Sequence, residues 1–472
     1  MVVFRPSIIQ LHFFAGFTDN MCADDLHSNT RGKNIVDLFN NKLHVASGTC
    51  CHLRGISPNL PPMTQPLPIE IRFLKRYAKA LHQAGVPAHQ LEGLIHATAR
   101  WMGYNCDFWS SPTAVFLSLR TRDDHDDQKP LPMQLVRLYP SATNLAATAE
   151  LYELGEDLIE GRLSLETAYQ TLRQPMAPIL YSNMLQVLAG SLVSGAFAVL
   201  FHSSWLGVLI ASLAGVLVGL MPVLLPRLQQ AGSLEPLAAL AISLFVYAFN
   251  SGFSSVETAS IIMSGLIVLM PGLGLTIAVT ELSTEHLSSG SARLAGALVV
   301  ILKLVLGVLV GKVIAGWLGW TDAGSWQWGS GFPPDWFQWP ALLLAGLAFA
   351  VLFNVRYRDI YLAVLAAFTG YVVSRVGVML GGVEFGILLA ALAVGLLGNL
   401  LGRWLRRPAS LVRVPGIILL VPGALGYRSV AHVLLDANPN PQETVLLAAI
   451  LVIALVGGLL IGNTIVPPRR FI

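Results

Sequence analysis

Apolar runs of about twenty residues recur after Tyr181, and they constrain the fold of this chain more than any other feature. Each run is long enough to cross the roughly 30 Å hydrocarbon core of a bilayer as a helix. The composition agrees, because only 12% of the residues are charged, against roughly 25% in soluble proteins. We therefore predict an α-helical polytopic membrane protein with about ten transmembrane helices. The predicted spans are centred near Leu192, Ala214, Ile242, Ile267, Leu304, Leu347, Ala366, Leu392, Leu420 and Val452.

A Pro-Gly break interrupts an apolar run twice, once in each half of the membrane region. Residues 264–275 read SGLIVLMPGLGL, and residues 414–426 read VPGIILLVPGALG. Backbone groups freed by such a break are tolerated only where they are buried in protein or line a wet cavity. A matched pair of breaks points to a transporter's substrate site, although a packing kink without ligand contact is the alternative. The candidate substrate-binding residues are Pro271, Gly272, Gly274, Thr276, Pro422, Gly423, Gly426 and Ser429.

The charges in the connecting loops predict the orientation. Arginines fall on alternate loops and at the C-terminus, whereas the other loops carry acidic residues. Because basic residues mark the cytoplasmic side, both termini are expected in the cytoplasm. A tryptophan-rich loop at 321–338 is expected outside and divides the spans into two halves of about five. Two repeats with an odd number of spans insert in opposite orientations, so we predict an inverted repeat.

The domain plan has five parts. Residues 1–66 form a disordered extension, or precede a true start near Met63, and residues 67–178 form a small cytoplasmic α+β domain. The two five-helix membrane repeats take residues 179–320 and 339–472, on either side of the outer loop. Within the α+β domain, apolar spacing predicts four helices, the last one capped by Ser164, and three strands. The helices are expected at Ile69–Ala84, Ala88–Met102, Asn144–Glu160 and Leu165–Leu172, and the strands at Cys106–Ser110, Thr113–Leu119 and Met133–Tyr139.

Three charged residues are candidates for coupling or gating. Lys303 lies ~15 Å along its helix from Arg293, which would place it near the midplane, where an ionisable group is a functional hypothesis. An internal ion pair of Lys303 with Glu281 or Glu257 is the alternative. Glu281 follows the first break by about three turns. It is a candidate proton carrier, or a cytoplasmic gate paired with Arg293, unless it is simply solvated in a loop.

The sequence argues against a cofactor, a metal site or an enzyme active site. The helix break at Gly85 and Pro87 separates His82 from His89 and His96, and the DDHDD loop lacks the spacing of a calcium site. Neither a phosphate-binding P-loop nor a G-x-S-x-G motif is present. The four cysteines fit no metal pattern and are expected to be reduced. We therefore expect no enzyme activity, no cofactor and no nucleic-acid partner.

Three stretches resemble the threonine/serine exporter (ThrE-type) family in its fused single-chain form. They begin LHQAGVPAHQLEGLIHATARW, MSGLIVLMPGLGLTIAVTELSTEH and FGILLAALAVGLLGNLLGRW, and the resemblance covers about Pro68 to the end. It implies ten spans after a cytoplasmic domain, and export of threonine and serine driven by the proton motive force. The second break departs from the family at Ala424, where glycine or a small hydroxylated residue is expected. The resemblance maps the family's Pro-Gly positions onto Pro271, Gly272, Pro422 and Gly423, and its short polar stretch after the first break onto Thr280, Glu281, Gly290 and Arg293.

The sequence therefore predicts a secondary transporter of threonine and serine in a bacterial inner (plasma) membrane. Its partners would be the amino acid, protons and membrane lipid, and a homo-oligomer is left open. In some bacteria the two halves of such a protein are separate and export succinate, so a dicarboxylate exporter of the same fold is the first alternative. A membrane-bound hydrolase is the second, and it lacks an evident catalytic pair.

Overall fold

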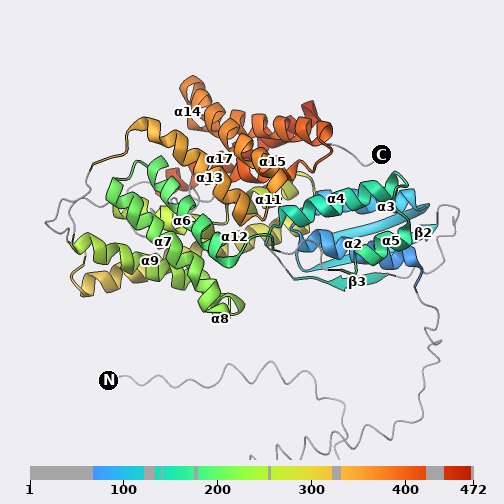
Figure 1. Ribbon diagram of the computed structural model, residues 1–472, viewed down its shortest axis with the longest axis horizontal. Helices are drawn as coiled ribbons and strands as arrows, with labels where there is room; N and C mark the ends of the chain where they lie inside the picture. Colours follow the sequence, from blue (N-terminus) through green and yellow to red (C-terminus); the bar gives the residue numbers. More distant parts are fainter. Residues whose placement is uncertain are drawn as a thin grey trace, which may run out of the picture. The chain divides into compact units, whose positions relative to one another are not determined.

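The computed structural model describes residues 67–121, 133–139, 142–174, 179–252, 257–320, 331–420 and 441–468. Residues Leu67–Ile472 form one compact unit. Within it, a small α+β region, blue to teal in Figure 1, packs against a larger set of apolar helices, green to red. The predicted extension at 1–66 lies outside the described residues.

The α+β region contains three antiparallel strands and four helices. Strand β2 (Ala114–Thr121) is central and pairs with β1 (Tyr104–Ser111) on one edge and β3 (Gln134–Arg137) on the other. All seven elements lie where the apolar spacing predicts them, with small shifts at their ends. The helices are α2 (Ile69–Gln83), α3 (Ala88–Trp101), α4 (Leu145–Ile159) and α5 (Leu165–Thr171).

Side-chain caps fix where these helices begin. The predicted cap is present, because the Ser164 hydroxyl accepts a hydrogen bond from the Thr167 amide at the start of α5. The Asn144 side chain accepts from the Ala147 amide at the start of α4 in the same way. Such caps satisfy amides that have no acceptor within the helix. The Asn144 cap therefore fixes where α4 begins, and α4 forms one wall of the site described below.

Within the described residues of the second region, all regular secondary structure is helical. Six of its helices are long and apolar enough to cross a membrane, or seven if one bent pair counts as a single span. The elements are α6 (Asn183–Leu200), α7 (Trp205–Leu224), α8 (Pro226–Gln230), α9 (Leu234–Gly252), α10 (Thr258–Leu266), η2 (Ile267–Leu269), α11 (Gly272–Ser283), α12 (Leu287–Trp317), η3 (Asp335–Phe337), α13 (Gln338–Leu352), η4 (Tyr357–Asp359), α14 (Ile360–Trp404), α15 (Ser410–Leu419) and α17 (Pro441–Ile465).

Two features account for the difference between this number and the ten predicted spans. Helix α14 is interrupted at Gly381 and Gly382, where φ of Gly382 is +88°. A Cβ added at Gly377 would meet the backbone of Gly386, so the two arms of α14 lie against each other as a hairpin. In addition, α15 is short, and residues 421–440 after it are outside the described part of the chain. Several predicted spans therefore do not stand as separate long helices.

Close helix contacts at glycine recur in the two halves. A Cβ added at Gly307 of α12 would meet the Pro236 carbonyl and Ala239 of α9. In the second half, a Cβ added at Gly458 of α17 would meet the Leu388 carbonyl and Ala391 of α14. Small residues at such points let helix backbones approach closely.

The contacts of the interrupted helices recur in the same way. Gly265 of α10 lies against Ala214 and Ile242, whereas Gly416 of α15 lies against Ala366 and Val394. Corresponding residues are separated by a nearly constant offset in sequence, the offset that also separates Pro271 from Pro422.

The α+β region is attached to the helix ends by backbone hydrogen bonds. The first amides of α4 donate to the end of α13, from Leu145 N to Phe353 O at 3.0 Å and from Ala146 N to Asn354 O at 3.1 Å. Helix α4 also contacts α15, which lies beside it in Figure 1. These contacts fix α3 and α4 over the ends of α14, α15 and α17.

Candidate functional site

The first Pro-Gly break is a bend between two helical segments. Helices α10 and η2 end at Leu269, α11 begins at Gly272, and the two parts are bent by 61°. Proline contributes no amide donor, and the amides of the first turn of α11 have no acceptor within the helix. The Thr276 hydroxyl donates to the Gly272 carbonyl at 3.0 Å. The Gly272 amide donates to the Met270 carbonyl and the Leu275 amide to the Pro271 carbonyl, both at 2.9 Å. The predicted break is therefore present.

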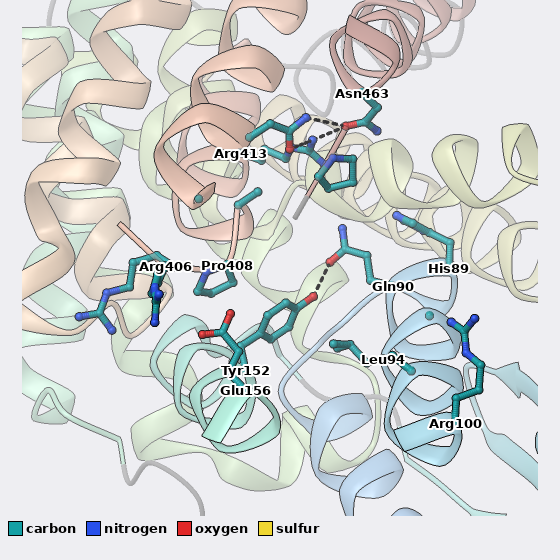
Figure 2. Close-up of a pocket in the computed structure, with 17 residues that line it drawn as sticks. His89, Gln90, Leu94, Arg100, Tyr152, Glu156, Arg406, Pro408, Arg413 and Asn463 are labelled. Atoms are coloured by element: carbon teal, nitrogen blue, oxygen red, sulfur yellow. Dashed lines mark hydrogen bonds between the residues drawn. The ribbon is translucent and has the colours of Figure 1, made fainter. Parts of the chain in front are cut away.

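A cavity of about 370 Å³ lies between the α+β region and the ends of three helices. Helices α3 and α4 form one side of it, and the end of α14 with α15 and α17 forms the other (Figure 2). The lining residues are His89, Gln90, Gly93, Leu94, Ala97, Arg100, Tyr152, Glu156, Asn399, Gly402, Arg406, Arg407, Pro408, Ala409, Arg413, Asn463 and Pro468.

A narrower cavity of about 70 Å³ reaches the broken helix. It shares His89, Gln90, Arg413 and Asn463 with the wide cavity, so the two adjoin. Of the predicted binding residues, Thr276 lines it. Its walls from α11 are Leu273, Thr276, Ile277 and Thr280. The structure therefore brings one side of the first break to a cavity that continues toward the α+β region.

Arg413 is the buried cation where the two cavities meet. Its side chain is only 9% exposed and donates to the Asn399 Oδ1 at 2.5 Å and to the Asn463 Oδ1. The two asparagines also bond to each other, from Asn399 Nδ2 to Asn463 Oδ1 at 3.1 Å. Among the described residues, Arg413 forms no ion pair with a carboxylate, and its Nε has no acceptor. A buried positive charge is thus held by neutral amides alone.

The α3 and α4 walls add a neutral histidine and a half-buried tyrosine. Burial lowers the pKa of His89 to about 4, and nearby positive groups add to this effect. The Tyr152 hydroxyl donates to Gln90 Oε1 at 3.3 Å, and burial raises the pKa of Tyr152. His89 is therefore uncharged near neutral pH, and Arg413 supplies the buried charge. The positive groups that act on His89 are His286, Arg413 and Arg293.

Glu281 and Arg293 lie together beside the cavity, not in its lining. The Glu281 carboxylate is fully buried, and its Oε2 lies 3.2 Å from Arg293 Nε. Its Oε1 accepts a hydrogen bond of 2.8 Å from the Ala88 amide, the first of α3. Close by, His286 Nε2 lies 3.1 Å from Glu92 Oε2. These contacts join α11 and α12 to α3, and the predicted role in coupling or gating stays a prediction.

Lys303 does not pair with Glu281 or Glu257. Its Nζ donates to the Gly232 carbonyl at 2.7 Å and lies 3.6 Å from Glu235 Oε2. Gly232 precedes α9 and Glu235 lies in its first turn, so Lys303 is level with the start of α9. It lines neither cavity, and its predicted role in coupling stays a prediction.

The other predicted binding residues divide into two groups. Pro271, Gly272 and Gly274 form the break and lie next to the cavity wall at Leu273. Pro422, Gly423, Gly426 and Ser429 lie outside the described residues.

Sequence reasoning missed the residues that meet at the cavity. Asn399 and Asn463 bond to each other between helices, which is the common role of an asparagine within an apolar helix. Arg413 is one of the arginines whose sequence positions indicate only the cytoplasmic side. The available signal was its place within the apolar approach to the second break.

No metal centre competes with this site in the described part of the chain. There, no group of three histidine, cysteine, aspartate or glutamate side chains is placed to hold a metal ion. Cys106, the one cysteine that the structure describes, is free, and burial raises its pKa to about 12.

Comparison with known proteins identifies two family matches in one chain. Residues 72–315 match the family described as "Putative threonine/serine exporter", and residues 339–465 match the family described as "Threonine/Serine exporter, ThrE". No solved structure was found to match the chain.

Similar full-length proteins come from yeasts. Pheromone-regulated membrane protein 10 of Eremothecium gossypii is 24% identical over 365 residues, which is 76% of this chain and 48% of that protein. The protein of the same name in Saccharomyces cerevisiae is 24% identical over 384 residues, 79% of this chain and 49% of that protein. The chain thus spans about half the length of these relatives.

The first match alone covers more than half of the chain, and the second covers most of the remaining helices. The chain carries the α+β region, the broken helix and the buried arginine within these matched residues. It is therefore a membrane protein that belongs to the threonine/serine exporter (ThrE) family, with both family segments fused in a single chain.

Proposed function

We propose that this protein is a secondary transporter that exports threonine and serine, driven by the proton motive force. The observation that carries the proposal is the continuity of the two cavities, which joins the broken helix α10–α11 to a buried cation. Broken helices that border a polar cavity are the usual substrate sites of secondary transporters. Membership of the exporter family supports membrane transport, and the family's description is the reason for choosing threonine and serine as the proposed substrates.

The recurring glycine contacts support a two-repeat architecture with ten spans. The α9–α12 contact at Gly307 and the α14–α17 contact at Gly458 involve the same kinds of neighbours at the same spacing. The two arms of α14, with the broken spans, would give five crossings in each half. Because five is odd, the repeats would be inverted, and both termini would lie on the cytoplasmic side of a bacterial inner membrane.

Alanine at the contact glycines tests the repeat. Gly307→Ala and Gly458→Ala should each lower the free energy of unfolding by about 1–3 kcal/mol, because the added methyl meets backbone. Gly316→Ala and Gly457→Ala are matched controls, since nothing lies within 4 Å of an added Cβ. Thermal unfolding in detergent measures the four variants. A large loss in one half and none in the other would argue against equivalent repeats.

The charges of the cavity favour an amino acid over a dicarboxylate. A dicarboxylate needs two cationic partners, and Arg413 is the buried one without a carboxylate among the described residues. Arg407 already contacts Glu153 and Asp359, and Arg406 lies 3.8 Å from Glu160. The dicarboxylate exporter therefore remains the alternative that the transport assay has to separate.

Efflux from preloaded cells tests the proposed function. Cells expressing the chain are loaded with labelled threonine, serine or succinate and followed with and without a protonophore. Efflux of threonine and serine that the protonophore abolishes is the expected result. Pro271→Ala should reduce it by about tenfold or more, because small misplacements at a binding site cost large factors. Pro222→Ala, in α7 and away from the cavities, is the control. Succinate efflux alone would select the alternative, and no efflux of any would refute the exporter.

We further propose that Glu281 and Arg293 act in gating. Their contacts with Ala88 and with each other tie α3 to the broken helix, so their rearrangement would move a wall of the cavity. Glu281→Gln should slow threonine efflux while leaving threonine binding within about threefold. The exposed Glu285→Gln is the control. Equal loss of binding and efflux would instead place Glu281 in the binding site.

A further inference from the structure

The Arg413 guanidinium is built into the protein in an unusual electrostatic state. It is 9% exposed, and the described residues that accept its hydrogen bonds are the neutral amides of Asn399 and Asn463. Burying a charge without a counter-charge is unfavourable, and such groups persist where they serve binding or catalysis. An anionic ligand would supply the counter-charge that the described residues do not.

The neighbouring asparagines have other bonds besides those from Arg413. Asn399 Nδ2 donates to Asn463 Oδ1 at 3.1 Å and to the Val466 carbonyl at 2.6 Å. These bonds join α14 to α17 whether or not Arg413 is present. The side chains of Asn399 and Asn463 thus orient the guanidinium of Arg413, a residue of α15. The Arg413 Nε has no acceptor among the described residues and so keeps a donor for a further partner.

The donor that remains on Arg413 suits a carboxylate. A guanidinium presents parallel N–H groups that match the two oxygens of a carboxylate. Nε has no acceptor in the described part of the chain, and Arg413 lines both cavities. A carboxylate approaching from the cavity would meet this donor directly.

Other unpaired polar atoms lie around the same point. The Ser410 hydroxyl and His89 Nδ1 are buried without partners among the described residues, and both residues line the narrow cavity. The Thr280 hydroxyl donates to the Thr276 carbonyl at 2.8 Å and so keeps its acceptor capacity. A small ligand with a hydroxyl or ammonium group beside its carboxylate would satisfy several of these groups at once.

The opposite wall carries a negative charge. Glu156 of α4 lines the wide cavity, and Figure 2 shows it across the cavity from Arg413. A second carboxylate on the ligand would meet this negative charge, which disfavours a dicarboxylate.

We propose that Arg413, held by Asn399 and Asn463, binds the carboxylate of a small zwitterionic amino acid. The assignment rests on the proposed transport function for its physiological role, but the binding itself can be measured without transport. It makes Arg413 a residue that determines which substrates enter the cavity.

Titration calorimetry on the purified full-length protein tests the proposal. Threonine, threoninol, which lacks the carboxylate, and succinate serve as ligands. Threonine should bind at least about tenfold more tightly than threoninol or succinate, as expected for a charge-assisted bidentate pair. Arg413→Met should weaken threonine by a similar factor and remove its advantage over threoninol. Arg227→Met, at an exposed arginine of α8 that lines neither cavity, should bind threonine within about threefold of the wild type.

Thermal unfolding of the same variants excludes a folding defect. Arg413→Met should melt at or above the wild-type temperature, because it removes an uncompensated charge; a structural arginine would give a lower melting temperature. If Arg413→Met does not fold, Arg413→Lys is measured in its place. Lysine keeps the positive charge but lacks the parallel N–H donors of the guanidinium, so threonine binding should still weaken. A folded variant with wild-type threonine affinity would overturn the proposal, as would wild-type protein that does not distinguish threonine from threoninol.

The binding and transport assays fail separately. Threonine efflux that is unchanged in Arg413→Met would overturn the arginine assignment and leave the exporter intact. Threonine binding that depends on Arg413, in a protein without efflux of threonine, serine or succinate, would uphold the site and refute the proposed function.

Discussion

A group of arginines that includes Arg356 and Arg407 lies at the same ends of the helices as Arg413, but the group and Arg413 differ in their partners. In the group, Arg356 forms a bidentate pair with Glu153 at 3.0 Å and contacts Asp359 at 3.0 Å. Arg407 contacts the same two carboxylates. Arg413 instead has two asparagines and no carboxylate among the described residues. Only a few residues separate Arg407 from Arg413 in sequence.

The difference separates attachment from recognition. Glu153 lies on α4, and its arginines lie at η4 and after α14, so the group fastens the α+β region to the helices. Each of its arginines has a carboxylate partner within the protein. Arg413 fastens nothing by charge and faces a cavity. Charges that are paired within the protein stabilise an interface, whereas an unpaired buried charge lowers stability. We expect such a charge to bind a ligand.

Removal of the shared carboxylate should have the largest effect on stability. Glu153→Ala should lower the free energy of unfolding by about 3 kcal/mol, because Arg356 would remain partly buried with fewer counter-charges. Thermal or denaturant unfolding in detergent measures the change. Glu160→Ala is the matched control, since Glu160 contacts two largely exposed arginines and should cost less than about 1 kcal/mol. Equal losses would mean that the network does not hold the interface.

Methionine at each arginine tests the comparison directly. Arg407→Met should destabilise by about 2 kcal/mol, because it leaves Glu153 and Asp359 with one arginine fewer. Arg413→Met should instead be neutral or stabilising by about 1 kcal/mol, since an unpaired charge is removed. Unfolding of the two variants side by side gives the answer. Destabilisation of the same size in both would make Arg413 another structural arginine.

Acid should weaken the α3 wall through His89. Its pKa in the fold is about 4, below the value of ~6.5 expected in the unfolded chain. Between these values the unfolded chain binds a proton that the native state does not, so stability falls as the pH falls through this window. The loss should reach up to about 2 kcal/mol between pH 7 and pH 5. Burial also lowers the pKa of His82, which acts in the same direction.

Unfolding measured from pH 7 to pH 4 in His89→Gln isolates this contribution. The variant should show a shallower loss of stability with acid than the wild type. His96→Gln, on the same helix, serves as the control. A pH dependence that is unchanged in His89→Gln would rule out His89 as a source of the acid sensitivity.

Lys303 should give the smallest effect. It is partly exposed, and its ion pair with Glu235 has a Nζ–Oε2 distance of 3.6 Å. Lys303→Met should change stability by less than about 0.5 kcal/mol and leave threonine efflux within about twofold. Unfolding and efflux are measured beside Arg413→Met. Loss of efflux in Lys303→Met alone would restore the midplane lysine as the coupling residue and weaken the case for Arg413.

The α+β region was predictable because its signals are local. Apolar spacing in α2 and α3, alternation in β1 and β2, and the Ser164 cap each depend on residues close in sequence. The first break was predictable for the same reason, since proline and glycine act on their own turn. The number of separate long helices was less predictable, because Gly381 and Gly382 turn α14 back within one apolar stretch.

The sequence by itself determined that this chain enters a membrane, that an α+β region precedes the helices, and that a helix breaks at Pro271. These follow from composition and short-range sterics. Only the tertiary structure decided that Lys303 meets Glu235 and that Arg413 meets Asn399 and Asn463. Those partners are distant in sequence, and the balance of a buried charge depends on which helices pack together. For that reason the same residue type, arginine, fastens a domain at one position and faces a cavity at another.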